Sequence, residues 1–362
     1  MTQTLLWTGF VVFVLAMLFI DLFIVSRGKG GEQQVVPPKK ALGITAIFVS
    51  LALMFGGVVY MVYDRGLMGE GVLAYDGKTP MTGAIALGEY LQVWMLEYAM
   101  SVDNLFVFTL VFSFFRVPAQ YQHRVLFWGI LGALILRGVM IGIGSAVVQA
   151  FAPVLILFGV VLILTAFKML KASDDQFDPS KSLAIKIAKK FFPVTDTIDC
   201  EKFFVNAPVG PLQADGTCRV VRAATPLFLV LCVVEATDLL FAVDSIPAAF
   251  GTSKQAFIIF TANVFAIMGL RSLYFAIAGL IDMFRYLKPA LAGILLFIGA
   301  KLMLAPELKF IRTGTDDAGN ATHWTGFHVP TEISLGIIVA LLVGGIVASL
   351  LHKPKKPVEH KQ

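Results

Sequence analysis

The stretch Glu97-Tyr-Ala-Met-Ser-Val-Asp103-Asn104 returns later in this chain as Asp238-Leu-Leu-Phe-Ala-Val-Asp244-Ser245. In both copies two acids stand six positions apart, and the second acid follows a valine. Both copies lie inside long apolar segments. Carboxylates are rare in segments that cross a membrane, and where they occur they mark ion pathways or proton relays. These two stretches therefore decide how the rest of the chain is interpreted.

The composition around them is that of a membrane protein. Of the 362 residues, 57% are hydrophobic and 15% are charged, whereas soluble domains carry about 25% charged residues. The apolar residues fall in blocks of about twenty, the length needed to cross a hydrocarbon core of about 30 Å. This pattern excludes soluble domains, a disordered chain, a disulfide scaffold and a coiled coil. It predicts an all-α polytopic membrane protein.

The apolar blocks predict about nine transmembrane helices. They cover Leu5–Val25, Ala41–Tyr63, Ala84–Phe115, Tyr121–Val148, Pro153–Leu170, Ala224–Phe250, Gln255–Ile281, Lys288–Leu304 and Glu332–Leu351. The chain is thereby divided into six parts. These are two peripheral helices (1–83), a first three-helix repeat (84–170), a cytoplasmic loop (171–223), a second three-helix repeat (224–304), an external loop (305–331) and a last helix with a basic tail (332–362).

Charge in the loops predicts the orientation in the membrane. Lysine and arginine gather in the first, third, fifth and seventh loops and in the tail after His352, whereas the second loop is acidic. Cytoplasmic loops carry such an excess of basic residues. All the basic loops lie on one side if the N-terminus is outside and the C-terminus is cytoplasmic. The net charge of +5 has the same origin and does not indicate a nucleic-acid partner.

The acidic stretches belong to a longer internal repeat. Each is followed by a span with one deep arginine and then by a span that ends near a lysine. These residues are Arg137 and Lys168 in the first copy, and Arg271 and Lys301 in the second. Because each copy has an odd number of spans, the two copies must cross the membrane in opposite senses. Inverted repeats of this kind are typical of secondary transporters, whose site lies near the midplane where the halves meet.

Five acids lie deep in the predicted spans: Glu97, Asp103, Glu235, Asp238 and Asp244. Each costs about 2.5–3.5 kcal/mol at a helix centre, or roughly 12–18 kcal/mol together. Arg137 and Arg271 are the deep cations, because Lys168 and Lys301 stand near helix ends and can reach water. Protons or a bound cation must then balance about three negative charges. The alternative is that the acids only pair with cations to hold the structure together.

The polar groups of the two stretches are oxygen donors. Carboxylates, the Asn104 amide and the Ser245 hydroxyl suit hard divalent ions such as manganese, magnesium or calcium. Pro247 removes one backbone hydrogen bond from the sixth span, and a helix broken there would turn Asp244 into a shared cavity. The long third span also has room for a break. The chain has no GxxxxGK[ST] phosphate-binding loop, so ATP is not expected to drive it.

Four segments resemble the TerC/Alx family of integral membrane proteins. The two signature segments are Glu97-x5-Asp103-Asn104-Leu105-Phe106-Val107 and Glu235-x2-Asp238-x5-Asp244-Ser245-Ile246-Pro247-Ala248. The other two are Val194–Asp199 and Leu270–Phe275, and the likeness runs from about residue 5 to 351. The resemblance implies a bacterial inner-membrane protein of the LysE-type transporter group, whose members are linked to manganese export.

The resemblance also implies which residues form the site. The acidic signature positions of the family fall on Glu97, Asp103, Asn104, Glu235, Asp238, Asp244 and Ser245. We expect these residues to bind the cation, with Glu235 lending charge or relaying protons. Arg137 and Arg271 are expected to lock the carboxylates or to replace the ion when the site is empty. Metal/proton antiport is the expected drive, since carboxylates exchange a metal for protons.

Other functions stay open at this point. One is transport of another solute, such as an amino acid or an oxyanion. Another is a membrane partner that transports nothing and acts in envelope stress, tellurite resistance or secretion. We expect neither enzymatic activity nor a fixed cofactor. The expected partners are membrane lipid, the divalent cation and protons, and a homo-oligomer or a contact with the secretion machinery is left open.

Three loop features carry weaker signals. Residues 182–192 alternate apolar and basic positions at helical spacing. They predict a helix that lies either on the anionic inner leaflet or on the cytoplasmic face of the bundle. His323 and His328 in the external loop are better explained by a polar surface than by a metal site. Cys200 and Cys218 are expected to be reduced thiols in the cytosol.

Overall fold

The computed structural model describes residues 2–20, 38–69, 71–151, 153–171, 183–195, 202–208, 220–277, 286–304, 308–315, 321–324 and 329–351. Within these ranges, nine helical segments are long and apolar enough to cross a membrane. They are α1 (Thr2–Ile20), α2 (Pro38–Asp64), α3 (Gly83–Phe114), α4 (Ala119–Ala150), α5 (Val154–Lys171), α7 (Pro226–Phe250), α8 with α9 (Ala256–Met268 and Leu270–Ile277), α10 (Leu287–Leu304) and α11 (Thr331–Leu351). The prediction of an all-α polytopic membrane protein is confirmed.

The helices form in apolar stretches of sequence, and residues that favour a helix start mark where some of them begin. Thr82 caps α3, because its hydroxyl accepts a hydrogen bond from the backbone N–H of Ile85 at 3.3 Å. Pro226 begins α7, at a position where its missing N–H would have no partner in any case. Large apolar side chains such as Leu5 and Phe19 on α1 are more than half exposed. Such a surface suits a helix that lies against lipid.

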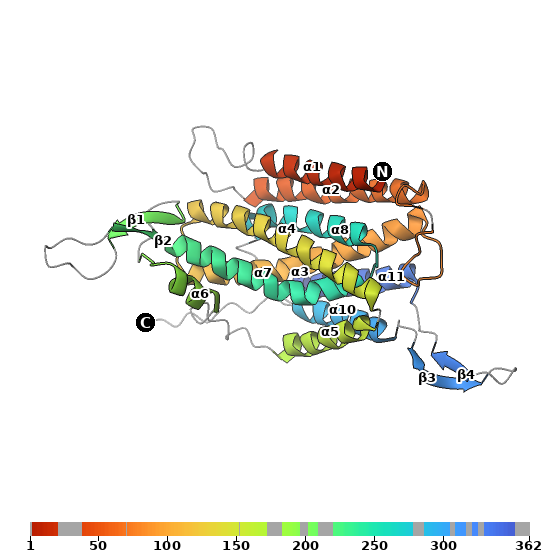
Figure 1. The fold of residues 1–362 in the computed structure, drawn as a ribbon. Coiled ribbons are helices and arrows are strands. Elements are labelled where there is room, and N and C mark those ends of the chain that lie inside the picture. Colours follow the sequence, from red (N-terminus) through yellow and green to blue (C-terminus); the bar gives the residue numbers. More distant parts are fainter. Residues whose placement is uncertain are drawn as a thin grey trace.

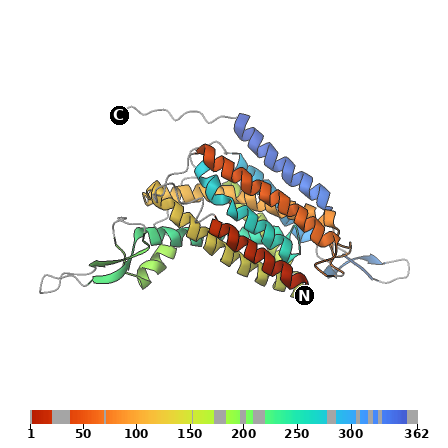
Figure 2. The same ribbon diagram turned by 90° about the horizontal axis from the view of Figure 1, so that it is seen from above.

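The centre of the bundle consists of α3, α4, α7 and α8 (Figure 1). α3 and α4 each pack against both α7 and α8. α5 pairs with α10, α2 packs on α3 and α9, and α11 lies on α10 and α3. Figure 2 shows α1 and α11 on opposite flanks of this assembly. Since the central helices are surrounded by others, their polar side chains can meet one another away from lipid.

The bundle has two distinct ends. The short helix α6 (Leu183–Phe191) and the antiparallel hairpin of β1 (Phe204–Pro208) and β2 (Val220–Ala224) lie at one end. The start of α1 and a second antiparallel hairpin, β3 (Leu308–Thr315) with β4 (Ala321–Trp324), lie at the other (Figure 1). We name these the α6 end and the α1 end. Neither hairpin was predicted from the sequence.

The helix predicted over residues 182–192 is present as α6. Ile185 and Ala188 are buried, and α6 packs against α7. Phe192 meets Phe228 of α7 edge-on, with ring centroids 5.6 Å apart. This geometry favours the interpretation that the helix rests on the face of the bundle. Phe191 remains 71% exposed, so α6 also has an outward apolar face.

A helix break occurs in a different span from the one expected. α7 runs through Pro247 to Phe250 without interruption, and α3 is continuous from Gly83 to Phe114. The expectation of a broken sixth or third span is therefore wrong. Pro247 stands in the last turn of α7, which lacks one backbone hydrogen bond there but continues to Phe250. The interruption lies in the seventh span, at Gly269 between α8 and α9.

α5 and α10 meet through two glycines. A Cβ on Gly159 would lie 2.7 Å from the Gly299 carbonyl oxygen, and a Cβ on Gly299 would lie 2.9 Å from that of Gly159. Small residues allow helix backbones in membranes to approach this closely. In the predicted repeat, α3, α4 and α5 correspond to α7, α8 with α9, and α10. Two inverted copies would then require that α5 and α10 contact each other through equivalent residues and that α3 packs on α8 as α7 packs on α4, and both contacts are present. The inverted repeat itself stays a prediction.

Several loop predictions fall outside the described residues. They concern Cys200, Cys218 and His328, and also the side chain of His323 in β4. Cys232, in α7, is a free thiol. The loop interpretations of the external histidines and of the cytosolic thiols therefore stay predictions.

Candidate functional site

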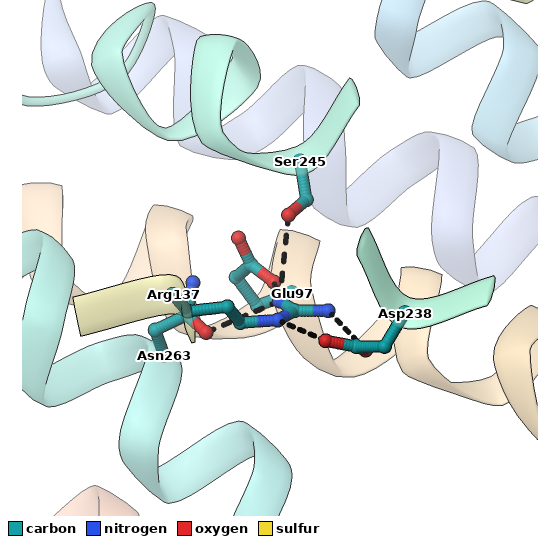
Figure 3. A network of polar contacts seen from close by, with 5 residues as sticks. All are labelled: Glu97, Arg137, Asp238, Ser245 and Asn263. Atoms are coloured by element: carbon teal, nitrogen blue, oxygen red, sulfur yellow. Dashed lines mark hydrogen bonds and ion pairs between the residues drawn. The ribbon is translucent and has the colours of Figure 1, made fainter. Parts of the chain in front are cut away.

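Arg137, near the middle of α4, is the centre of a buried polar network (Figure 3). Its Nη1 donates a hydrogen bond to Glu97 Oε2 on α3 at 2.6 Å. Its Nη2 and Nε donate to Asp238 Oδ1 and Oδ2 on α7 at 3.0 and 3.3 Å. The second contact is two-pronged, the geometry to which a planar guanidinium is suited. Arg137 thus joins two acids that come from the two predicted repeats.

Two neutral side chains complete the network. Nη1 of Arg137 also donates to Asn263 Oδ1 on α8 at 3.1 Å, and it lies 3.4 Å from Ser245 Oγ on α7. Glu97, Asp238, Ser245 and Arg137 were all predicted as site residues, but Asn263 was not. An amide within the apolar sequence of α8 is the signal that could have found it.

The network has fewer positive than negative charges, and two of its buried polar atoms have no hydrogen-bond partner among the described residues. Two carboxylates face one guanidinium, so one negative charge stays uncompensated when Glu97 and Asp238 are both ionised. In the part of the chain that the structure describes, the buried atoms Glu97 Oε1 and Asn263 Nδ2 have no hydrogen-bond partner. Buried polar atoms in proteins nearly always have one. The network is therefore incomplete without a further proton, water or ion.

A small cavity of about 10 Å³ lies beside Arg137 and Asp238. Phe108 and Leu126 are among the residues that line it. Phe108 belongs to the last turns of α3 and Leu126 to the first turns of α4, so the cavity extends from the network toward the α6 end. Its volume holds about one water molecule. The hollow beside the acids is therefore narrow.

Asp244 does not belong to this network. Its Oδ1 accepts a hydrogen bond from Thr165 Oγ1 of α5 at 2.8 Å, and Lys168 of the same helix is near enough to interact with its charge. Lys168 is exposed, and its reach to water stays a prediction. Asp238 and Asp244 stand six positions apart on one unbroken helix, and they consequently face different neighbours.

Glu235 lies one turn before Asp238 on α7 and is half-buried. Its carboxylate rests against Gly132 of α4, where an added Cβ would overlap it. Only glycine leaves room for the acid at this position. Among the described residues, no hydrogen bond or ion pair of Glu235 is found. Glu235 is therefore placed next to the network without being held by it.

The remaining predicted residues are not joined to Arg137 by the observed hydrogen bonds. Asn104 is buried within α3, and the side chain of Asp103 lies outside the described residues. Arg271 is buried at the start of α9, close to His123. The described residues contain no group of three or more His, Cys, Asp and Glu that could hold a metal ion. Of the seven predicted cation ligands, three meet at Arg137: Glu97, Asp238 and Ser245.

A second buried charge cluster lies toward the α1 end. Glu89 of α3 is fully buried, and it accepts hydrogen bonds from Ser253 Oγ at 2.6 Å and from the backbone N–H of Tyr75 at 3.0 Å. Lys301 of α10 is near the Glu89 carboxylate and donates to Ser334 Oγ of α11 at 3.3 Å. The expectation that Lys301 reaches water is wrong: it is 5% exposed, because α11 covers this end of α10.

The family model described as Integral membrane protein TerC family matches residues 82–357. The chain belongs to the TerC family. The matched region runs from α3 to α11 and contains the Arg137 network together with Glu89, Ser253 and Lys301, whereas Tyr75 lies just before it. The resemblance predicted from the acidic segments is thereby confirmed.

Relatives of this TerC protein match over most of their length. An uncharacterized membrane protein of Myxococcus xanthus is 38% identical over 97% of this chain and 94% of its own. The thylakoid membrane protein TERC of Arabidopsis thaliana is 40% identical over 91% of this chain and 73% of its own. Alx of Escherichia coli K12, described as a putative membrane-bound redox modulator, is 36% identical over 94% of this chain and 92% of its own. No solved structure matches the chain.

Sequence reasoning overlooked Glu89 of this TerC protein. The acid stands close to the predicted start of its span, at Ala84. Acids at such positions usually reach the interface with water. The signal that could have found it is a matching cation, since Lys301 stands equally close to the end of its own span.

Proposed function

We propose that this TerC protein exports a divalent cation across the bacterial inner membrane in exchange for protons, with manganese as the preferred ion. One observation carries the proposal. Arg137 holds a positive charge between two buried carboxylates that come from α3 and α7, near the middle of both helices. The guanidinium occupies the position that the transported cation takes when the site is filled. Arg137 is then the internal substitute for the ion in the empty state.

The groups around the guanidinium are ligands for a hard cation. When Arg137 moves away, the Glu97 and Asp238 carboxylates, the Ser245 hydroxyl and the Asn263 amide oxygen are left facing one point. Oxygen donors of this kind suit manganese, magnesium or calcium and not metals that prefer nitrogen or sulfur. Asp103 and Asn104, which share α3 with Glu97, are the proposed additional ligands.

The charge of the network supports exchange of the cation for protons. With Arg137 in place, one proton neutralises the surplus negative charge of Glu97 and Asp238. A divalent cation that displaces Arg137 needs both carboxylates ionised, so its binding releases this proton. Glu235 is the proposed relay, because it lies one turn from Asp238, is half-buried and has no hydrogen-bond or ion-pair partner among the described residues.

The proposed orientation places the α6 end in the cytoplasm and the start of α1 outside. The basic loops between α3 and α4 and after α5 then face the cytoplasm, where such loops belong. The small cavity beside Arg137 and Asp238 extends toward the same end. In this orientation the small cavity lies on the cytoplasmic side of the site, the side from which an exporter binds its cation.

A purely structural network is the rival function, and one observation favours it. Glu97 and Asp238 are both already bonded to Arg137, and the adjoining cavity measures only about 10 Å³. A membrane partner that transports nothing would use the same contacts to hold α3, α4 and α7 together. The two functions differ in whether the carboxylates ever exchange Arg137 for an ion.

Flux through the purified protein tests the proposal. Proteoliposomes with an entrapped metal-sensitive dye are given manganese, magnesium or calcium under an imposed pH gradient. We expect manganese flux that depends on the gradient and that is lost in Asp238→Asn and Glu97→Gln. Asp64→Asn, at an exposed acid at the end of α2, is the matched control and should keep the flux. Flux at the wild-type level in both site variants, or no flux of any of the three ions through the wild type, would contradict the proposal.

A further inference from the structure

Glu89 and its neighbours close the α1 end of the bundle. Glu89 comes from α3, Tyr75 from the loop between α2 and α3, Ser253 from the loop between α7 and α8, and Lys301 from α10. We name these four residues the Glu89 latch. Its hydrogen bonds to Ser253 and Tyr75 measure 2.6 and 3.0 Å, and the Lys301 Nζ lies 4.5 Å from the centroid of the Tyr75 ring. The latch therefore connects the first predicted repeat with the second.

We propose that Glu89 is a second proton-binding carboxylate of the transport cycle, and that its protonation opens the path from the Arg137 network to the α1 end. The inference rests on the proposed function, because only a transporter needs such a path. The deprotonated carboxylate holds Ser253 and Lys301 against α3 and keeps the path closed. A neutral carboxyl no longer attracts Lys301, and the two repeats can separate at this end.

The position of the latch on the path supports this role. A cavity of about 250 Å³ at the α1 end is lined by Tyr75, Thr331 and Glu332 among others, and Glu332 is exposed. Tyr75 is bonded to Glu89, and Thr331 accepts a hydrogen bond from Gln92 Nε2 at 2.9 Å through its carbonyl oxygen. Glu89 and Gln92 thus lie directly behind two residues of the cavity wall.

Gln92 connects the latch with the deeper network. It is buried on α3 between Glu89 and Glu97, and its Oε1 has no hydrogen-bond partner among the described residues. An unpaired buried oxygen at this position is suited to accept a hydrogen bond from water once the latch opens. The segment from Glu89 to Glu97 is therefore the proposed route between the cavity and the cation site.

The charges around Glu89 explain why its protonation state is decisive. The charged and titratable groups that act on it are Lys301 from α10, Lys254 from the loop after α7, and the phenols of Tyr75 and Tyr63. Burial, and then the charge of Glu89, raise the pKa of the Tyr75 phenol above its usual range, so this phenol stays neutral. The Glu89 carboxylate is thus the negative charge of the latch that acts on Lys301 and Lys254.

Cysteine labelling can measure the opening of the latch directly. Cys200, Cys218 and Cys232 are replaced by serine, and Gln92→Cys is introduced as the reporter in protein held in lipid nanodiscs without metal. The rate of reaction with a hydrophilic maleimide is divided by that of Thr79→Cys, an exposed position at the same end, to cancel the pH dependence of the thiol. We expect slow labelling of the reporter at high pH and faster labelling as the pH falls.

Variants of the latch give the decisive comparison. Glu89→Gln mimics the protonated carboxyl, so it should raise the labelling rate by about tenfold or more and abolish its pH dependence, because a buried Lys301 is left unpaired. Lys301→Met should restore slow labelling in the double variant. Asp64→Asn, at an exposed acid on α2 outside this cavity, is the control and should behave as wild type. If Glu89→Gln fails to fold, Ser253→Ala removes one hydrogen bond of the latch and should give a smaller increase that keeps its pH dependence.

Two results would overturn the inference. One is a labelling rate of folded Glu89→Gln equal to that of wild type, and the other is a wild-type rate that does not change with pH. Neither measurement uses a transported ion. If the labelling responds as expected but the protein carries no manganese flux, the proposed cargo is wrong and the inference about Glu89 stands. If the protein carries manganese flux but the labelling does not respond, the inference about Glu89 is wrong and the proposed function stands.

Discussion

Arg137 and Asp238 form a two-bond ion pair between α4 and α7, with distances of 3.0 and 3.3 Å and with side chains that are 3% and 7% exposed. A buried ion pair loses most of its hydration, so each charge depends on the other. The partners stand 101 positions apart in the sequence. The pair is the contact that a cation bound between α3 and α7 has to replace.

Removal of the guanidinium should destabilise the protein strongly. Arg137→Gln leaves two buried carboxylates without a counter-charge, and we expect a loss of about 3–5 kcal/mol in the free energy of unfolding. Arg137→Lys should lose less, because an ammonium keeps the charge but cannot form the two-pronged contact. Denaturant unfolding in detergent measures both, with the exposed Arg65→Gln as control. Equal stability of Arg137→Gln and the control would show that the acids are not ionised together.

Asp244 should tolerate loss of its charge better than Asp238. In Asp244→Asn the amide oxygen still accepts the hydrogen bond from Thr165, whereas Asp238→Asn loses one of the two bonds to Arg137. We expect manganese flux to be abolished in Asp238→Asn and only reduced in Asp244→Asn. Proteoliposome flux under the same pH gradient gives the comparison. Complete loss in Asp244→Asn with an unchanged melting temperature would place Asp244 among the cation ligands.

Gly132 should be essential as long as Glu235 is present. In Gly132→Ala the new methyl group overlaps the Glu235 carboxylate and pushes α4 and α7 apart, with an expected cost of about 1–3 kcal/mol. Glu235→Ala in the same chain should restore most of this stability, because the clash is gone. Thermal unfolding of the two single variants and the double variant forms the test. Additive effects of the two changes would mean that the side chains do not touch.

The two glycines between α5 and α10 should behave differently from a glycine that faces open space. Alanine is a better helix former than glycine by about 1 kcal/mol, so Gly142→Ala, with no atom near the added methyl group, should be neutral or stabilising. Gly159→Ala places a methyl group 2.7 Å from the Gly299 carbonyl oxygen and should destabilise by about 1–3 kcal/mol. Thermal unfolding in detergent should show a lower melting temperature for Gly159→Ala and no decrease for Gly142→Ala. A melting temperature of Gly159→Ala that is not lower than that of wild type would argue against close packing of α5 on α10.

The spans could be predicted from the sequence because crossing a membrane is a local property. The length and apolarity of one segment decide it without reference to other segments, and α4 and α10 begin and end within a few residues of the predicted bounds. The break of the seventh span at Gly269 was missed, and Pro247 was given too much weight. A proline removes one backbone hydrogen bond but does not by itself end a helix, and α7 continues past Pro247 to Phe250.

The sequence by itself determined that acids stand deep in apolar helices and that arginines oppose them, because burial of a charge in a membrane requires compensation wherever the partner is. Only the tertiary structure decided the partners. Arg137 joins Glu97 with Asp238, and Asp244 turns to Thr165 instead. Partner choice depends on the rotation and contact of helices far apart in the chain. For the same reason Lys301 is buried beside Glu89: a side chain near a helix end reaches water only if no neighbouring helix covers it.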